Sequence, residues 1–281
     1  MTDVELKLRE TAKRLLSDGT AGYVIGWEAT RFDDKTKPAF ITKPEDAEKL
    51  VWNKYCVNSL AKYALDDPYP DKKIAVCVRG CDSRAVNRMI MDNQLLRDNL
   101  YLIGMPCDGK EMEICKICRH KNPVIYDELT GGLTGGPAGE TPGGRFDEAA
   151  ALEAMTPDER YAFWEAEYGK CIRCYACRNV CPACNCRECY ADQNRVGWQG
   201  KQMNTAQNQV YGLTRAYHTG DRCIECGECE RVCPMDIPVM RQTKKILKDI
   251  NELFGPYECG LPDDRTPILG EYNLGDADDF M

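Results

Sequence analysis

The residues best suited to chemistry are the eighteen cysteines of this 281-residue chain, eight of which form two copies of one spaced run. Each copy follows the pattern C-x2-C-x2-C-x3-C-P, the spacing that holds [4Fe–4S] cubane clusters. The first copy comprises Cys171, Cys174, Cys177 and Cys181, and the second comprises Cys223, Cys226, Cys229 and Cys233. The doubled pattern therefore predicts iron–sulfur chemistry.

The fourth cysteine of each run is expected to serve the opposite cluster. Three thiolates on one tight loop reach three corners of a cubane, and in two-cluster ferredoxins the fourth ligand crosses over from the other run. We therefore predict one cluster on Cys171, Cys174, Cys177 and Cys233, and another on Cys223, Cys226, Cys229 and Cys181. Zinc sites more often use two C-x2-C pairs with a long spacer, and disulfide frameworks are typical of small secreted domains. The pattern disfavours both.

Composition narrows the possible partners. The formal net charge of −8 argues against a nucleic-acid partner, because a phosphate backbone attracts basic surfaces. The N-terminus lacks an apolar core of signal-peptide length, and no stretch approaches the roughly 20 apolar residues of a membrane span. We therefore expect a cytoplasmic protein with no membrane span. No phosphate-binding glycine loop and no nucleophile or acid–base motif is present, so we predict no catalytic residue.

The chain is predicted to hold an α/β N-terminal domain followed by an α+β, ferredoxin-like 2[4Fe–4S] domain. Apolar periodicity predicts helices at 4–17 and 44–65, and a strand at 22–27. Strand 73–78, helix 82–96 and strand 100–105 predict a parallel βαβ unit. Seven glycines and two prolines between Gly131 and Arg145 indicate a linker. The predicted domains are residues 1–130, a linker at 131–155, the cluster domain at 156–258 and an acidic tail at 259–281.

Four further cysteines lie where the βαβ unit should bring them together. The carboxyl ends of parallel strands meet at one edge of a sheet, and Cys81 and Cys107 follow two such ends. Cys115 and Cys118 follow in a C-x2-C turn, with little chain in which to leave that edge. The alternative is that these four are buried or incidental thiols, since cysteine is often fully buried.

These residues carry a family resemblance. The Gly80-Cys81-Asp82 element, the strand ending at Cys107, the C-x2-C turn and the acidic segment up to Gly131 resemble the beta-subunit family of deazaflavin (coenzyme F-420)-reducing hydrogenases and formate dehydrogenases. The R-G-C-D element is also similar to one in electron-transfer subunits of sulfhydrogenases and anaerobic sulfite reductases. The resemblance implies a third [4Fe–4S] cluster on Cys81, Cys107, Cys115 and Cys118, and it is compatible with a bound FAD beside it.

A last group of thiols follows the first run. Cys184, Cys186 and Cys189 occupy a 41-residue gap between the two runs, which is longer than a compact ferredoxin needs. Three close thiols could bind a further cluster or a zinc ion, with Cys259 or another thiol completing the set. An inserted loop with free thiols is the alternative.

Together these features predict an iron–sulfur electron-transfer subunit of an anaerobic, multi-subunit oxidoreductase complex. It would relay single electrons between a catalytic partner (a hydrogenase, a formate dehydrogenase or a heterodisulfide-reductase-like subunit) and a second redox partner such as ferredoxin. On this hypothesis the chain has no substrate chemistry of its own. The main alternative is a flavin-containing oxidoreductase subunit that itself reduces a deazaflavin, a nicotinamide or ferredoxin.

Overall fold

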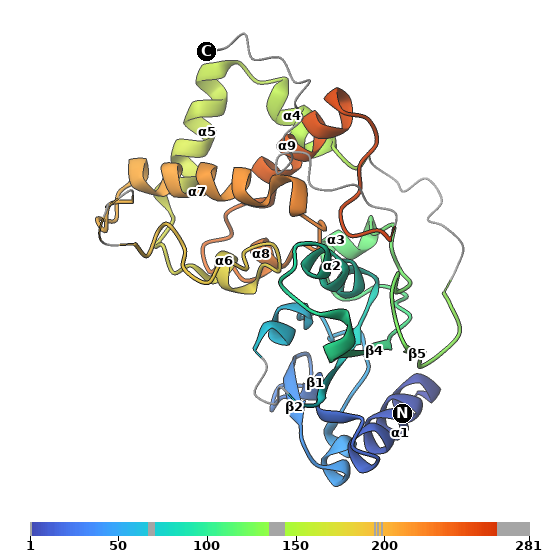
Figure 1. The fold of residues 1–281 in the computed structure, drawn as a ribbon. Helices are drawn as coiled ribbons and strands as arrows, with labels where there is room; N and C mark the ends of the chain where they lie inside the picture. Colours follow the sequence, from blue (N-terminus) through green and yellow to red (C-terminus); the bar gives the residue numbers. More distant parts are fainter. Residues whose placement is uncertain are drawn as a thin grey trace, which may run out of the picture.

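The N-terminal domain of the computed structural model is built on a five-stranded sheet (Figure 1). The structure describes residues 2–66, 71–134, 144–193, 195, 197 and 199–262. The strand order is β2-β1-β3-β4-β5. Their bounds are β1 (Ala21–Ala29), β2 (Thr36–Ile41), β3 (Lys73–Val78), β4 (Leu100–Gly104) and β5 (Glu128–Leu129). Strand β2 is antiparallel to β1, and the other pairings are parallel.

The predicted βαβ unit is present. Strand β3 leads into α2 (Gly80–Met91), and the chain returns in β4, which pairs with β3 in parallel from Ile74↔Leu100 to Val78↔Gly104. Helix α2 ends earlier than predicted, because Asn93 takes a left-handed backbone with φ 55°. The short helix η3 (Arg97–Asn99) then leads into β4.

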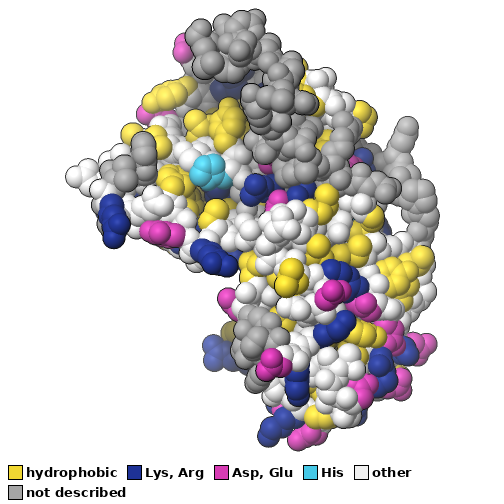
Figure 2. Space-filling view, viewed as in Figure 1, with side chains coloured by type: hydrophobic (Ala, Val, Ile, Leu, Met, Phe, Trp, Pro, Cys, Tyr) yellow, Lys and Arg dark blue, Asp and Glu magenta, His cyan; other side chains and the backbone are white. Residues whose placement is uncertain are grey.

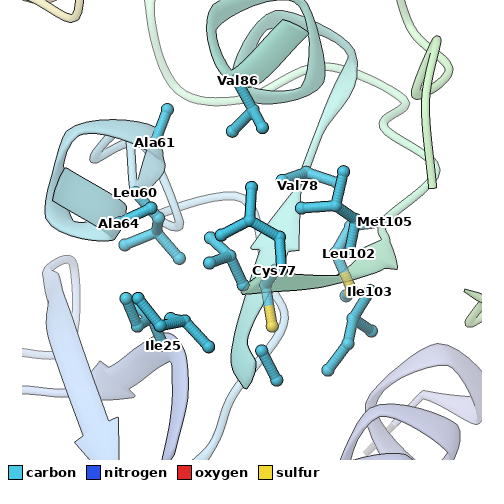
Figure 3. Packing of buried hydrophobic residues seen from close by; sticks show 14 of the residues in the cluster. Ile25, Leu60, Ala61, Ala64, Cys77, Val78, Val86, Leu102, Ile103 and Met105 are labelled. Atoms are coloured by element: carbon cyan, nitrogen blue, oxygen red, sulfur yellow. The ribbon is translucent and has the colours of Figure 1, made fainter. Parts of the chain in front are cut away.

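The core of this domain lies around the central strands. Helix α1 (Asp3–Ser17), predicted from its periodicity, buries Leu8, Ala12 and Leu15. Strand β3 is buried along nearly its whole length, as expected for a strand in a parallel sheet. Figure 3 shows Cys77 in the middle of this packing, among side chains that include Ile25 and Ile103. Cys77 is therefore a core residue.

The predicted helix at 44–65 is wrong. The structure has two 3-10 helices, η1 (Pro44–Lys49) and η2 (Ala61–Leu65), with an irregular segment between them. The Arg79 guanidinium donates hydrogen bonds to the carbonyl oxygens of Cys56, Val57 and Asn58 at 2.7–3.2 Å. These carbonyls therefore serve a distant side chain, and a helix would have used them for its own backbone bonds.

The C-terminal half differs from the predicted α+β fold. Among the residues described after Leu129 there are helices but no strands. The 41-residue gap between the cysteine runs supplies a long helix, α7, which packs on α5 and α9. The helices are α4 (Asp147–Glu153), α5 (Pro157–Gly169), α6 (Ala176–Val180), α7 (Thr205–Thr219), η4 (Gly220–Arg222), α8 (Glu228–Arg231) and α9 (Met240–Leu253).

Two segments expected to lie outside the folded domains are packed. Helix α4 falls within the predicted linker, where Ala149 and Leu152 are buried and the helix packs against α9. The start of the predicted tail packs on α2, because the Asn87 amide donates to the carbonyls of Gly260 and Leu261 at 3.2 and 3.1 Å. The rest of the tail, and part of the glycine-rich stretch, lie outside the described residues.

The two halves are in contact near α2 (Figure 1). Arg84 on α2 donates hydrogen bonds to the carbonyls of Cys259 and Ile224 at 2.9 and 3.3 Å.

In Figure 2, acidic and basic side chains are interspersed over the surface of the N-terminal domain. No helix in the described part of the chain is both long and apolar enough to cross a membrane.

Candidate iron–sulfur centres

The two cysteine runs fold into the same local shape. In the first, Arg173 and Tyr175 adopt left-handed backbones with φ 49° and 59°, and in the second Glu225 and Gly227 do so at the matching positions with φ 58° and 73°. A left-handed backbone costs a non-glycine residue roughly 1–2 kcal/mol. Because such strained conformations cluster at functional sites, their repetition at matching positions indicates that each run forms a functional site. The turn curls the backbone around the first sulfur of each run.

Backbone amides point at sulfur in both runs. The amide of Arg173 donates to Cys171 Sγ, and that of Glu225 donates to Cys223 Sγ, each at 3.4 Å. The amide of Ile237 donates to Cys233 Sγ, also at 3.4 Å. Hydrogen bonds of this kind stabilise a thiolate and are among the factors that set a cluster's potential. The donors are placed as an iron–sulfur site requires.

The crossed arrangement of the fourth cysteine is visible in the packing. One small cavity is lined by Cys181 together with Cys223, Cys226 and Cys229. Cys181 also interacts electrostatically with each of those three thiols. We call these four residues the inner set. They come from both runs, as the sequence predicts.

The other four cysteines form a matching group. Cys171 interacts electrostatically with Cys174 and Cys233, and Cys177 does so with Cys171 and Cys233. We call these four residues the outer set, because Cys174 is solvent-exposed. The structure brings each predicted foursome together, whereas the assignment of the thiols as ligands stays a prediction.

The chemistry of the inner set fits a cluster. Burial raises the pKa of the Cys223 thiol to about 12 and also raises the pKa values of Cys226 and Cys229. Such thiols stay protonated in the absence of metal, and iron would displace the proton and compensate the buried charge. Arg215 is 6% exposed and lies close enough to Cys181 and Cys229 to add a positive field. No sequence motif marks this arginine, because its burial depends on the packing of α7.

The N-terminal group of cysteines also converges. Cys81 lies at the start of α2, Cys107 follows β4, Cys115 lies in α3 (Glu113–Lys116), and Cys118 comes just after α3. Cys81 interacts electrostatically with Cys107 and Cys118, and so does Cys115. Burial raises the pKa of Cys81 and Cys115. We call these four residues the N-terminal set.

Gly80 explains how this set is brought together. A Cβ at Gly80 would overlap the carbonyl oxygen of His120, so only glycine lets the chain just after Cys118 lie against the start of α2. The amide of Cys107 donates to the Lys121 carbonyl at 2.9 Å, which ties the segment after β4 to the same chain. The R-G-C-D element thus has a packing role as well as a chemical one.

The flanking residues of that element form a buried ion pair. Arg79 is 3% and Asp82 0% exposed, and Arg79 Nε lies 2.6 Å from Asp82 Oδ2. Asp82 also accepts from the Arg79 backbone amide at 3.3 Å. The pair fixes the start of α2, and with it the position of Cys81.

The remaining trio is less convergent. Cys184 contacts Cys181 of the inner set, Cys186 is exposed, and Cys189 contacts Arg178. Cys259 is buried in the N-terminal core, where its carbonyl accepts from Arg84. Within the described ranges, no group of three or more His, Cys, Asp or Glu side chains is placed to hold a single metal ion. Cubane ligands are spread wider than those of one ion, because each thiolate binds a different iron. The metal predicted at the trio stays a prediction, as does FAD.

Comparisons with known proteins bear on the two cysteine runs of the C-terminal half. Residues 167–237 match the family model described as a 4Fe–4S dicluster domain, so the chain carries such a domain. The "F420-dependent formate dehydrogenase subunit beta" of Methanocaldococcus jannaschii is 22% identical, with 83% of this chain and 85% of the relative covered. The "F420-dependent formate dehydrogenase 1 subunit beta" of Methanococcus maripaludis is 25% identical, with 83% and 84% covered.

A further relative matches a shorter stretch. One protein of the "Ion-translocating oxidoreductase complex" of Buchnera aphidicola is 37% identical over 83 residues, which are 28% of this chain and 15% of that protein. The two formate dehydrogenase subunits align over most of this chain, so their similarity extends well beyond the cluster domain. The resemblance to the beta-subunit family of deazaflavin-reducing hydrogenases and formate dehydrogenases, predicted from the sequence, is therefore confirmed.

Proposed function

We propose that this chain is the iron–sulfur electron-transfer subunit of an oxidoreductase complex, with three [4Fe–4S] clusters on the N-terminal, inner and outer sets. Such clusters accept and pass single electrons. The protein's part is to hold the thiolates in place, exclude water and direct backbone amides at sulfur. The similarity to formate dehydrogenase beta subunits supports a catalytic partner that oxidises or reduces a small substrate elsewhere in the complex.

The observation that carries the proposal is the order of the three sets. Ile114, next to Cys115 of the N-terminal set, lies against Gly227 in the loop between Cys226 and Cys229 of the inner set. The inner and outer sets exchange their fourth cysteines, so they are neighbours as well. The order is therefore N-terminal, inner, outer, and it ends at the exposed Cys174.

The two ends of this series suit two different partners. At one end the N-terminal set lies in the α/β domain, and at the other the outer set reaches the surface of the helical half. An electron entering at one end would cross the inner set before it leaves at the other. We propose that the catalytic partner and the second redox partner dock at opposite ends.

An anaerobic redox titration tests this function. The purified chain should contain iron and acid-labile sulfide in equal amounts, with about twelve iron atoms per chain for three cubanes. Its electron paramagnetic resonance signals should appear and disappear reversibly with potential. A preparation without labile sulfide, or with signals that do not change with potential, would contradict the proposal. Stoichiometric flavin fluorescence after acid release would favour the flavin-containing alternative.

A further inference from the structure

A cavity beside the inner set, lined in part by Cys184, Cys186 and Cys189, belongs to none of the three proposed clusters. It has a volume of about 540 Å³, which is within the range of small-molecule sites. Its walls come from Lys62 on η2, from the loop that carries the Cys184 trio, from α7 and from η4. It therefore lies where the N-terminal domain meets the cluster-bearing half.

The cavity is rich in positive charge. Its lining holds five basic side chains against two acidic ones; the basic residues are Lys62, Arg178, Arg187, Arg215 and Arg222. The acidic residues are Asp192, which pairs with Arg178 at 2.7 Å, and Asp221. The whole chain carries a net charge of −8, so the excess of basic side chains in this cavity is opposite in sign to the charge of the protein as a whole. A cleft lined with one sign of charge raises the local concentration of oppositely charged ligands.

Two buried polar groups of the lining lack partners within the described residues. Tyr211 is 4% exposed, and its hydroxyl makes no hydrogen bond within the described residues. Arg215 is 6% exposed, and its Nε makes none either, although its terminal nitrogen donates to the Cys177 carbonyl at 3.2 Å. A buried unsatisfied donor costs roughly 1–3 kcal/mol. Both residues line the cavity, so a ligand with acceptor oxygens would satisfy these two buried atoms once the side chains turn toward it.

The cavity and the inner set share a wall. Ala183, Arg215 and Arg222 line both this cavity and the smaller one between the four inner cysteines. The remaining lining includes Tyr190 and Tyr217, whose rings offer flat faces. A ligand bound in this cavity would be separated from the inner set only by these shared wall residues.

We propose that this cavity binds the phosphate or pyrophosphate group of a small molecule. Arginine pairs with phosphate oxygens through two parallel N–H donors, and several positive charges match a ligand with more than one negative charge.

The consequence for electron transfer rests on the proposed function. A bound anion disfavours adding an electron to the neighbouring inner set, so reduction should weaken its binding by the same factor as binding disfavours reduction. A tenfold difference in affinity corresponds to about 59 mV for a one-electron couple.

Calorimetric titration of the anaerobically purified full chain with pyrophosphate tests the proposal. At low ionic strength we expect one saturable site whose affinity falls as salt is added. Arg222→Gln and Tyr211→Phe should each weaken binding about tenfold, since each removes one hydrogen bond to a charged group. Tyr211→Phe should leave iron content and melting temperature unchanged, because its hydroxyl has no partner among the described residues. The matched controls Lys13→Gln and Tyr161→Phe lie on exposed faces elsewhere and should bind pyrophosphate normally.

The same titration with ADP separates two sources of the phosphate group. Tighter binding of ADP than of pyrophosphate assigns the cavity to a nucleotide whose ring uses the tyrosine faces, and equal binding assigns it to the free anion. No saturable binding, or equal weakening in the controls, overturns the proposal. An iron content of about sixteen atoms per chain that falls to about twelve in a Cys184→Ser, Cys186→Ser, Cys189→Ser variant overturns it too, because a fourth cluster would then fill the cavity. Failure of the proposed function would appear separately, as clusters that do not respond to potential.

Discussion

Ile114 packs on Gly227, so that a Cβ added to the glycine would lie 2.8 Å from Ile114 Cγ2. The isoleucine precedes Cys115 of the N-terminal set, and the glycine lies between Cys226 and Cys229 of the inner set. This contact joins the α/β domain to the dicluster domain at the point where two predicted clusters are neighbours. Gly227 is further constrained by its left-handed backbone, with φ 73°.

A Gly227→Ala substitution should separate the two sets. The left-handed backbone alone costs alanine roughly 1–2 kcal/mol, and overpacking against Ile114 adds about 1–3 kcal/mol. We therefore expect a lower melting temperature and weaker magnetic interaction between the reduced clusters. Gly19→Ala is the matched control, because Gly19 has φ 75° and nothing within 4 Å of its added Cβ. If both variants change the melting temperature and the magnetic interaction equally, the contact between Ile114 and Gly227 does not hold the two sets together.

Gly80→Ala should remove the N-terminal cluster alone. The added methyl group would overlap the His120 carbonyl and push the segment that carries Cys118 away from Cys81. Iron content should fall by about one third, since one of three cubanes is lost. The signals of the inner and outer sets should persist in electron paramagnetic resonance spectra. Gly132→Ala, with open space around its added Cβ, should keep all the iron; full iron content in Gly80→Ala would refute the role of this glycine.

Some parts of this architecture could be predicted from sequence because the information is local. Strands β3 and β4 are short apolar runs, and the predicted bounds match or nearly match the observed ones. The crossing of Cys181 and Cys233 follows from the repeated motif, because one tight loop cannot supply four corners of a cubane. The convergence of Cys81 and Cys107 follows from parallel strands that end at one edge.

Other parts depend on contacts between distant segments. The irregular stretch between η1 and η2 exists because Arg79 takes the carbonyls of Cys56, Val57 and Asn58, a demand that no local pattern reveals. Arg215 has the sequence surroundings of an ordinary helical residue, and only the packing of α7 makes it buried beside the inner set. The absence of strands from the described part of the cluster domain escaped prediction because the cysteine motif specifies ligands, whereas the long connection between the runs determines the fold.

Single serine variants test the crossed ligation. Cys181→Ser should perturb the cluster on Cys223, Cys226 and Cys229, although it belongs to the other run, and Cys233→Ser should perturb the cluster on Cys171, Cys174 and Cys177. Serine oxygen is a harder, more basic ligand than thiolate sulfur, so each variant should lose or shift one signal in an anaerobic redox titration. Cys77→Ala is the control, because Cys77 is buried in the core away from these sets and should change stability without changing iron content. If the two serine variants alter the same signal, the crossing is refuted.

Asp82→Asn should destabilise the N-terminal domain more than the loss of a surface ion pair would. Neutralising Asp82 leaves the Arg79 guanidinium buried without its counter-ion, and breaking a buried pair costs about 3–5 kcal/mol. The control is Asp46→Asn, whose pair with Lys49 lies at the surface and should contribute little to stability because solvent screens it. Denaturant unfolding of the two variants under anaerobic conditions measures the difference. Because the same pair fixes the start of α2, iron bound to the N-terminal set should also be lost earlier from Asp82→Asn during incubation with a chelator. Similar unfolding midpoints and similar rates of iron loss in both variants would show that the pair neither stabilises the domain nor positions Cys81.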